Sequence, residues 1–169
     1  VDVAASLWYS PAVAFVSARE LLLGTGGGYF APNATLTGGE LVTVLWRLAG
    51  CPAVEGQTGT EWYAQAAQWA SSLSIVSDGF DGDQPATRAD VASALYVMAG
   101  ALEAETGLSG SLNFADAAAI PEDAMDAFLY CQQNGIITGR PGGLAAPGAA
   151  LTRGELSAMV QRFILALLK

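Results

Sequence analysis

Three short strings in the sequence combine a threonine with an acid three positions later: Thr37-Gly38-Gly39-Glu40, Thr87-Arg88-Ala89-Asp90 and Thr152-Arg153-Gly154-Glu155. This spacing is typical of a capping box. The threonine side chain accepts a hydrogen bond from the third helical N–H, and the acid accepts one from the N–H of the threonine. The strings therefore predict three helix starts, capped by the pairs Thr37/Glu40, Thr87/Asp90 and Thr152/Glu155.

Capping does not explain Arg88 and Arg153, because a cation in the first turn opposes the helix dipole and costs about 0.3–1 kcal/mol. One interpretation is an arginine that bridges to a nearby carboxylate. The other is a ligand site, because a helix N-terminus, a glycine-rich loop and an arginine fork together suit a carboxylate or a phosphate. On the second interpretation, loss of Arg153 should hardly change the stability of the fold.

The elements that position these strings recur along the chain. After each threonine, apolar residues lie at +4, +7, +8 and +11, which is one face of an α-helix. A shorter helix is expected before each string, because three sets of residues align: Trp8, Ala12, Phe15 and Val16; Trp62, Ala66, Trp69 and Ala70; Asp123, Ala127, Tyr130 and Cys131.

A glycine-rich loop joins the two helices of each unit. It spans 13 positions from Gly24 to Thr37 and from Gly139 to Thr152, but only 9 from Asp78 to Thr87. The units are copy one (1–50), copy two (60–100) and copy three (114–166). A single pair of helices cannot cover its own apolar face, so we expect the copies to pack into one compact all-α domain.

Composition narrows the possible functions. The 169 residues carry a formal net charge of −9 and include no histidine. Such a charge argues against nucleic acid and anionic membranes as partners, and it requires any anionic ligand to be held by local positive groups.

The sequence contains no histidine, no serine elbow and no persuasive carboxylate pair, so we expect neither an enzyme nor a cofactor. No apolar run reaches the ~18 residues of a membrane span. The start at Val1, inside a motif, suggests a piece of a larger protein, in which we expect a monomeric domain.

Two loops resemble ligand motifs without completing them. The glycine run 24–28 lacks the Gly-Lys-Ser/Thr of a phosphate loop. The acidic loop 78–83 lacks the bidentate glutamate of a calcium loop, so we expect an ordinary acidic turn and no metal. Cys51 and Cys131 are expected to be unlinked thiols.

The order of these elements resembles the S-layer homology (SLH) family. Its Phe-x-Asp motif matches Phe114-Ala115-Asp116 and, in part, Asp2-Val3, and its aromatic pair matches Trp8-Tyr9 and Trp62-Tyr63. Its Gly-Ile-x-x-Gly segment matches 135–139, and its Gly-x-Phe-x-Pro turn matches 28–33. The resemblance implies three tandem repeats in a pseudo-threefold spindle around a central three-helix bundle. It also implies non-catalytic anchoring at the bacterial cell surface, in the cell wall or S-layer, through an anionic, pyruvylated secondary cell-wall polymer.

The resemblance places the polymer in grooves between neighbouring copies. The residues implied to contact it are Arg153, Arg88, Trp8, Trp62, Gly139, Gly24 and Asn33. For the two tryptophans, an ordinary core position is the alternative.

The copies depart from the family motifs in different ways. Copy one has Gly38 in place of the arginine, copy two has a short loop with Asp78 in place of the glycine, and copy three has Asp123 in place of the tryptophan. Copy three alone keeps both a full loop and the arginine. Arg153 should therefore contribute most to binding, and Gly38→Arg should strengthen it. A degenerate structural or protein-interaction module is the alternative function.

Overall fold

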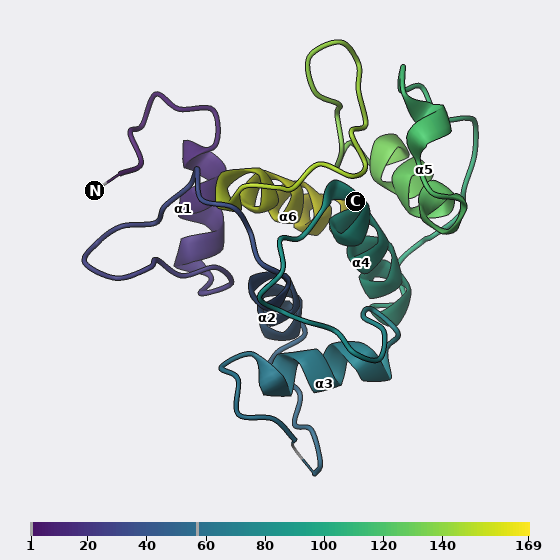
Figure 1. Cartoon of the computed structure of the whole chain (residues 1–169). Coiled ribbons are helices and arrows are strands. Elements are labelled where there is room, and N and C mark those ends of the chain that lie inside the picture. The colour runs from purple at the N-terminus through teal and green to yellow at the C-terminus, as the bar shows by residue number, and fades with distance from the viewer. Residues whose placement is uncertain (1, 57) are drawn as a thin grey trace.

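The computed structural model describes residues 2–56 and 58–169, and this part of the chain is helical without a strand (Figure 1). The all-α fold class is therefore confirmed. Three long helices are present, α2 (Gly38–Leu48), α4 (Arg88–Ala101) and α6 (Arg153–Leu167). Three shorter helices are α1 (Ser10–Ala18), α3 (Ala64–Ser72) and α5 (Met125–Gln133), and two 3₁₀ turns, η1 (Ala117–Ala119) and η2 (Glu122–Ala124), precede α5.

The long helices begin where the threonine strings place them. At Thr37, Thr87 and Thr152 the backbone is extended, and each side chain accepts a hydrogen bond from the backbone N–H three residues later. The acid at that later position accepts a hydrogen bond from the N–H of the threonine in all three helices. Both halves of the capping box are thus formed, which leaves the opposite carboxylate oxygen of each acid available to other groups.

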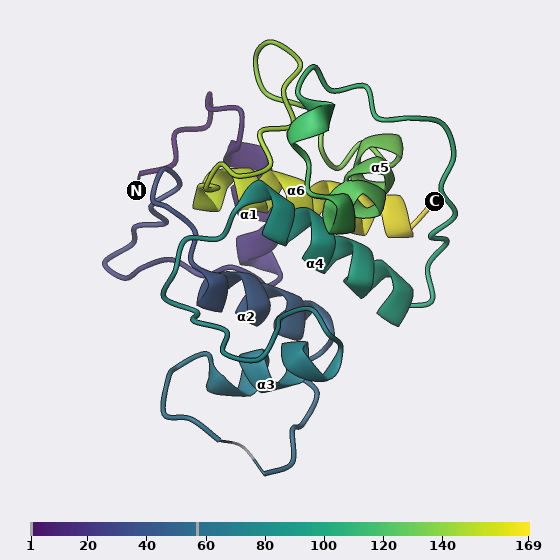
Figure 2. The same cartoon turned by 45° about the vertical axis from the view of Figure 1, so that its right-hand side comes forward.

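The copies are held together by an exchange of helices. Short helix α1 packs against α6, α3 packs against α2, and α5 packs against α4, so each short helix covers the long helix of another copy. In Figure 1 the short helices lie towards the outside and the long helices nearer the centre, and Figure 2 shows α3 alongside α2. The exchange explains why one copy could not bury its apolar face alone.

A ring of backbone hydrogen bonds joins the three helix starts. The N–H of Leu36 donates to Leu151 O at 2.8 Å, Leu151 N–H donates to Ala86 O at 3.0 Å, and Ala86 N–H donates to Leu36 O at 2.9 Å. All three residues are buried. The same contact is therefore made three times around one centre, while the spindle shape and the central three-helix bundle stay predictions.

The remaining expectations about the fold concern thiols and membranes. Cys51 is exposed and Cys131 is buried, and both are free thiols, as expected. Burial raises the pKa of the Cys131 thiol to about 12. Among the described helices, none combines the length and hydropathy needed to cross a bilayer.

Candidate ligand-binding grooves

Groove A lies beside the glycine-rich loop of copy one and has a volume of about 300 Å³. Its walls come from that loop and from α2, with Trp62 supplied by copy two and Arg153 supplied by copy three. The lining residues are Leu22, Leu23, Gly24, Thr25, Glu40, Thr43, Val44, Arg47, Trp62 and Arg153. Three of the residues expected to contact the ligand therefore meet in one groove, although each comes from a different copy.

Groove C is the corresponding space beside the loop of copy three, with a volume of about 360 Å³. Here copy one supplies Trp8 and copy two supplies Arg88, and Gly139 lies in the loop. The other lining residues are Ile136, Ile137, Thr138, Arg140, Pro141, Glu155, Ala158, Met159 and Arg162. Groove C thus repeats the composition of groove A: an indole, an arginine and a glycine-containing loop.

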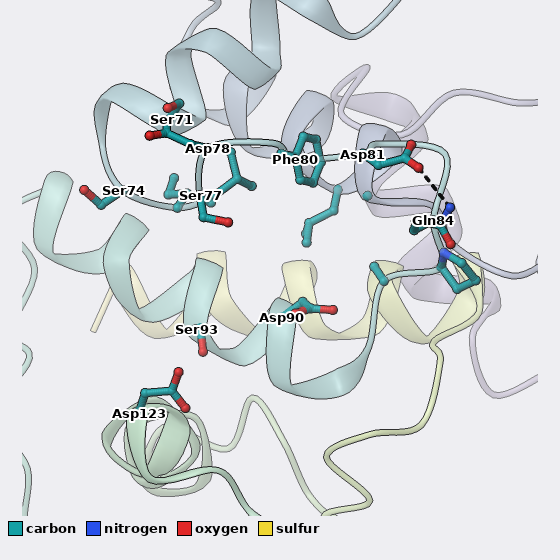
Figure 3. Close-up of a pocket in the computed structure, with 16 residues that line it drawn as sticks. Ser71, Ser74, Ser77, Asp78, Phe80, Asp81, Gln84, Asp90, Ser93 and Asp123 are labelled. Atoms are coloured by element: carbon teal, nitrogen blue, oxygen red, sulfur yellow. Dashed lines mark hydrogen bonds between the residues drawn. The ribbon is translucent and has the colours of Figure 1, made fainter.

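Groove B lies beside the short loop of copy two and is the larger space, at about 720 Å³. Four aspartates line it (Asp78, Asp81, Asp90 and Asp123), and no basic residue does. Figure 3 shows Asp78 on the loop at one side of this space, Asp90 on α4 and Asp123 in the segment before α5. Asp81 accepts hydrogen bonds from Asp83 N–H and from the Gln84 amide, so this loop is stabilised by its own side chains.

The departures from the family motifs gather in groove B. Gly38 from copy one, Asp78 from copy two and Asp123 from copy three all line this one space. Grooves A and C contain none of these three substituted positions. Because every groove takes residues from all three copies, one altered groove appears in the sequence as three differently altered copies.

Trp8 and Trp62 are exposed, which excludes the core interpretation. Their exposed fractions are 64% and 65%, whereas the tyrosines that follow them are buried. Each indole meets its neighbouring tyrosine ring edge-on, with 5.3 Å between centroids. Tyr63 lies against Gly39, where an added Cβ would come within 2.5 Å of the ring. In each pair the tyrosine is the buried core residue, and its ring packs against the tryptophan that lines the groove.

Arg153 is only 3% exposed, and each of its three guanidinium nitrogens has a partner within the protein. Its Nε donates to Phe30 O at 2.9 Å, its Nη1 pairs with Glu40, and its Nη2 donates to Leu23 O. The guanidinium also lies 4.8 Å from the centroid of the Phe30 ring. These contacts join copies one and three, so they oppose the expectation that loss of Arg153 would hardly affect stability.

Arg88 is buried as well, but it is less engaged. Its Nε donates to Ala145 O at 2.6 Å, and no carboxylate of the described chain forms an ion pair with it. Burial lowers the pKa of Arg88, and the neighbouring charge of Arg140 lowers it further. The two arginines of the matching strings therefore have different surroundings.

Three basic residues of these grooves were missed from the sequence. Arg47 lines groove A and Arg162 lines groove C, each ten positions after the capping threonine. Their Nη1 atoms donate to equivalent carbonyls, of Leu21 and Ile136, both at 3.2 Å. Arg140, which also lines groove C, has no arginine at the matching position of copy one. Arg47 and Arg162 could have been found from the sequence by aligning the polar positions of the long helices as well as the apolar ones.

The loops of grooves A and C are fixed by aspartates. Asp2 accepts hydrogen bonds from the N–H groups of Phe30 and Ala31, at 2.8 and 2.7 Å, and these bonds lower its pKa. Asp116 accepts the matching pair from Ala145 and Ala146. Burial alone would raise the pKa of Asp116, but these hydrogen bonds and the charge of Arg88 outweigh it and lower the pKa. The Phe-x-Asp motif therefore orders the loop.

The expected glycines have backbone reasons for their identity. A Cβ at Gly24 would lie 2.5 Å from Tyr29 O, and Gly139 has a φ of +83°. Asn33, in contrast, is exposed in the following turn and lines neither groove A nor groove C. A Cβ at Gly38 would lie 2.9 Å from the Phe80 ring. An arginine at this position would have to displace that ring, so we no longer expect Gly38→Arg to strengthen binding.

The architecture is that of a helical repeat domain whose candidate grooves lie between copies. The family model of the S-layer homology domain matches residues 1–42 and 113–157, just over half of the chain, and the chain belongs to this family. SLH domains are binding and anchoring domains without catalysis, and they occur in surface proteins attached to the cell wall or S-layer by wall polymers. Copy two lies outside the matched segments, so the count of three repeats stays a prediction. A comparison with curated proteins found no match.

Proposed function

We propose that the chain tethers a surface protein to the bacterial cell wall by binding an anionic secondary cell-wall polymer, with a pyruvylated sugar as the bound unit. The observation that supports this most is the distribution of positive charge. Of the seven basic residues in a chain of net charge −9, five line grooves A and C. In a repulsive overall field, an anion is held where cations are concentrated locally.

The other side chains of the two grooves suit a charged sugar. An exposed indole offers a flat apolar surface to the C–H face of a sugar ring, and its edge-on contact with a buried tyrosine fixes its orientation. Guanidinium groups bind carboxylates through charge-assisted hydrogen bonds. Volumes of about 300 and 360 Å³ lie at the small end of ligand sites, as expected for one or two sugar units.

Groove B is not part of the proposed binding surface. Its four aspartates would repel an anionic polymer, and it has neither the tryptophan nor the arginine of the other two grooves. We therefore expect two binding sites per domain.

Sedimentation with purified cell walls tests the proposal. The unmodified chain should bind intact walls and should lose binding after the polymer is removed chemically. The double variant Trp8→Ala/Trp62→Ala should bind at least about tenfold more weakly, because truncating a central aromatic residue costs on the order of 2 kcal/mol. Tyr29→Ala is the matched control, since this exposed aromatic lines neither groove A nor groove C.

Two outcomes would oppose the proposal. Equal binding to stripped walls would show that the polymer is not the ligand. No binding to intact walls by a folded chain would favour a structural or protein-interaction module that keeps the fold without the polymer.

A further inference from the structure

Grooves A and C place equivalent arginines in equivalent positions, but the two arginines have different partners. Arg153 and Arg88 both follow a capping threonine, and both use Nε to donate to the equivalent loop carbonyl, Phe30 O in groove A and Ala145 O in groove C. In groove A the guanidinium then pairs with Glu40, the acid of the capping box. In groove C the equivalent acid is Glu155.

Glu155 is already paired with another residue. Arg140 Nη2 lies 2.8 Å from Glu155 Oε1, and the second oxygen of Glu155 accepts the N–H of Thr152. Arg140 comes from the loop of copy three. The matching position in the loop of copy one is Thr25. Arg140 thus occupies the carboxylate oxygen that, by equivalence with groove A, would otherwise bind Arg88.

As a result, Arg88 keeps free hydrogen-bonding capacity inside the groove. It is 6% exposed, and within the described residues its two terminal nitrogens have no hydrogen-bond partner. They are not enclosed by protein, because Arg88 lines groove C. Because Nε is bound to the loop and the terminal nitrogens face the groove, the Arg88 guanidinium can offer charge-assisted hydrogen bonds to an anion from outside the chain.

We propose that Arg140 is a positioning residue that gives the two grooves different specificities: by pairing with Glu155 it leaves Arg88 free to bind the anionic group of the ligand in groove C. This inference rests on the proposed function and deepens it. In groove A, each of the three guanidinium nitrogens of Arg153 already has a partner within the protein, so we expect Arg153 to contribute less to anion binding than Arg88.

Calorimetric titration of the whole chain with a pyruvylated amino-sugar glycoside tests this, with the same glycoside lacking the pyruvyl group as the neutral arm. Arg140→Thr copies the residue of copy one and should weaken binding of the charged glycoside about tenfold, because Arg88 can then pair with Glu155. Arg140→Lys should restore most of the affinity. Arg19→Thr is the matched control, since it removes the same charge from a residue that lines neither groove A nor groove C.

A second substitution separates positioning from direct contact with the ligand. Glu155→Gln keeps a capping-box side chain but removes the charge that Arg88 would bind. In the Glu155→Gln background, Arg140→Thr should cost less than about twofold. If it still costs about tenfold there, Arg140 contacts the ligand itself and the inference is overturned.

The remaining outcomes distinguish the inference from the proposed function. If the unmodified chain binds the charged glycoside and Arg140→Thr binds it equally well, the inference fails while the proposed function stands. If the unmodified chain binds neither glycoside yet sediments with intact walls, the pyruvylated unit is wrong, and the inference falls with it. If it binds neither glycosides nor walls, the proposed function itself fails.

Discussion

Replacing Arg153 with methionine tests whether this arginine is a structural link between copies. The change removes the ion pair with Glu40, two hydrogen bonds to carbonyl oxygens and the contact with the Phe30 ring. Removing one partner of a buried pair typically costs 3–5 kcal/mol. Glu40 keeps its bond to Thr37 N–H and its side chain is 19% exposed, so we expect the lower end, about 3 kcal/mol. For a domain of this size, that lowers Tm by roughly 6–12 °C.

Urea unfolding followed by far-UV circular dichroism measures this cost, and the m-value should not change if the native and denatured states keep their compactness. Arg88→Met is the internal control. It loses one carbonyl contact and no ion pair, so we expect about 1 kcal/mol or less. In a double-mutant cycle, Arg153→Met and Glu40→Gln together should cost less than the sum of the single changes. A cost below about 1 kcal/mol for Arg153→Met would refute the structural role.

Three further predictions concern other parts of the chain. Gly38→Arg should lower the urea midpoint and should not improve wall binding, because its side chain meets the Phe80 ring in a groove of four aspartates; a gain in wall binding would contradict the assignment of groove B. The lowered pKa of Asp116 means that its contribution to stability is present above pH 3.8 and is lost as the pH falls through the folded-state pKa. Urea midpoints of the unmodified chain and Asp116→Asn should therefore differ at neutral pH and converge as the pH falls below 3.8, and a constant difference would oppose this. Thiol titration should find one reactive group, Cys51, in the native state and two in denaturant; two fast thiols in the native state would show that Cys131 is accessible.

Much of the fold could be predicted because its signals are local. The capping boxes at Thr37, Thr87 and Thr152 mark the start of each long helix to the residue. The apolar periodicity after them predicts which helix face is buried. The exchange of short helices between copies could not be predicted, because an apolar face indicates that a partner exists without indicating which one it is.

The sequence indicates several of the residues that line the grooves, but it does not indicate how the copies arrange them. Arg88, Arg153, Trp8 and Trp62 do line grooves, but the sequence pairs each arginine with the loop of its own copy. In the structure, Arg153 meets the loop of copy one and Arg88 meets the loop of copy three. Arg153 pairs with Glu40, which lies 113 positions away in the chain. The spacing within one motif carries no information about such a contact.

The ring of hydrogen bonds through Leu36, Ala86 and Leu151 has a consequence for how such a domain can evolve. An open solenoid can gain or lose a unit at either end, because each unit touches only its neighbours. In a closed ring, a deletion would leave one short helix without its long helix and one backbone acceptor without its donor. We therefore expect that deleting any one copy would destabilise the other two. Within that triplet, selection can relax on one groove while all three sets of helices are retained for folding.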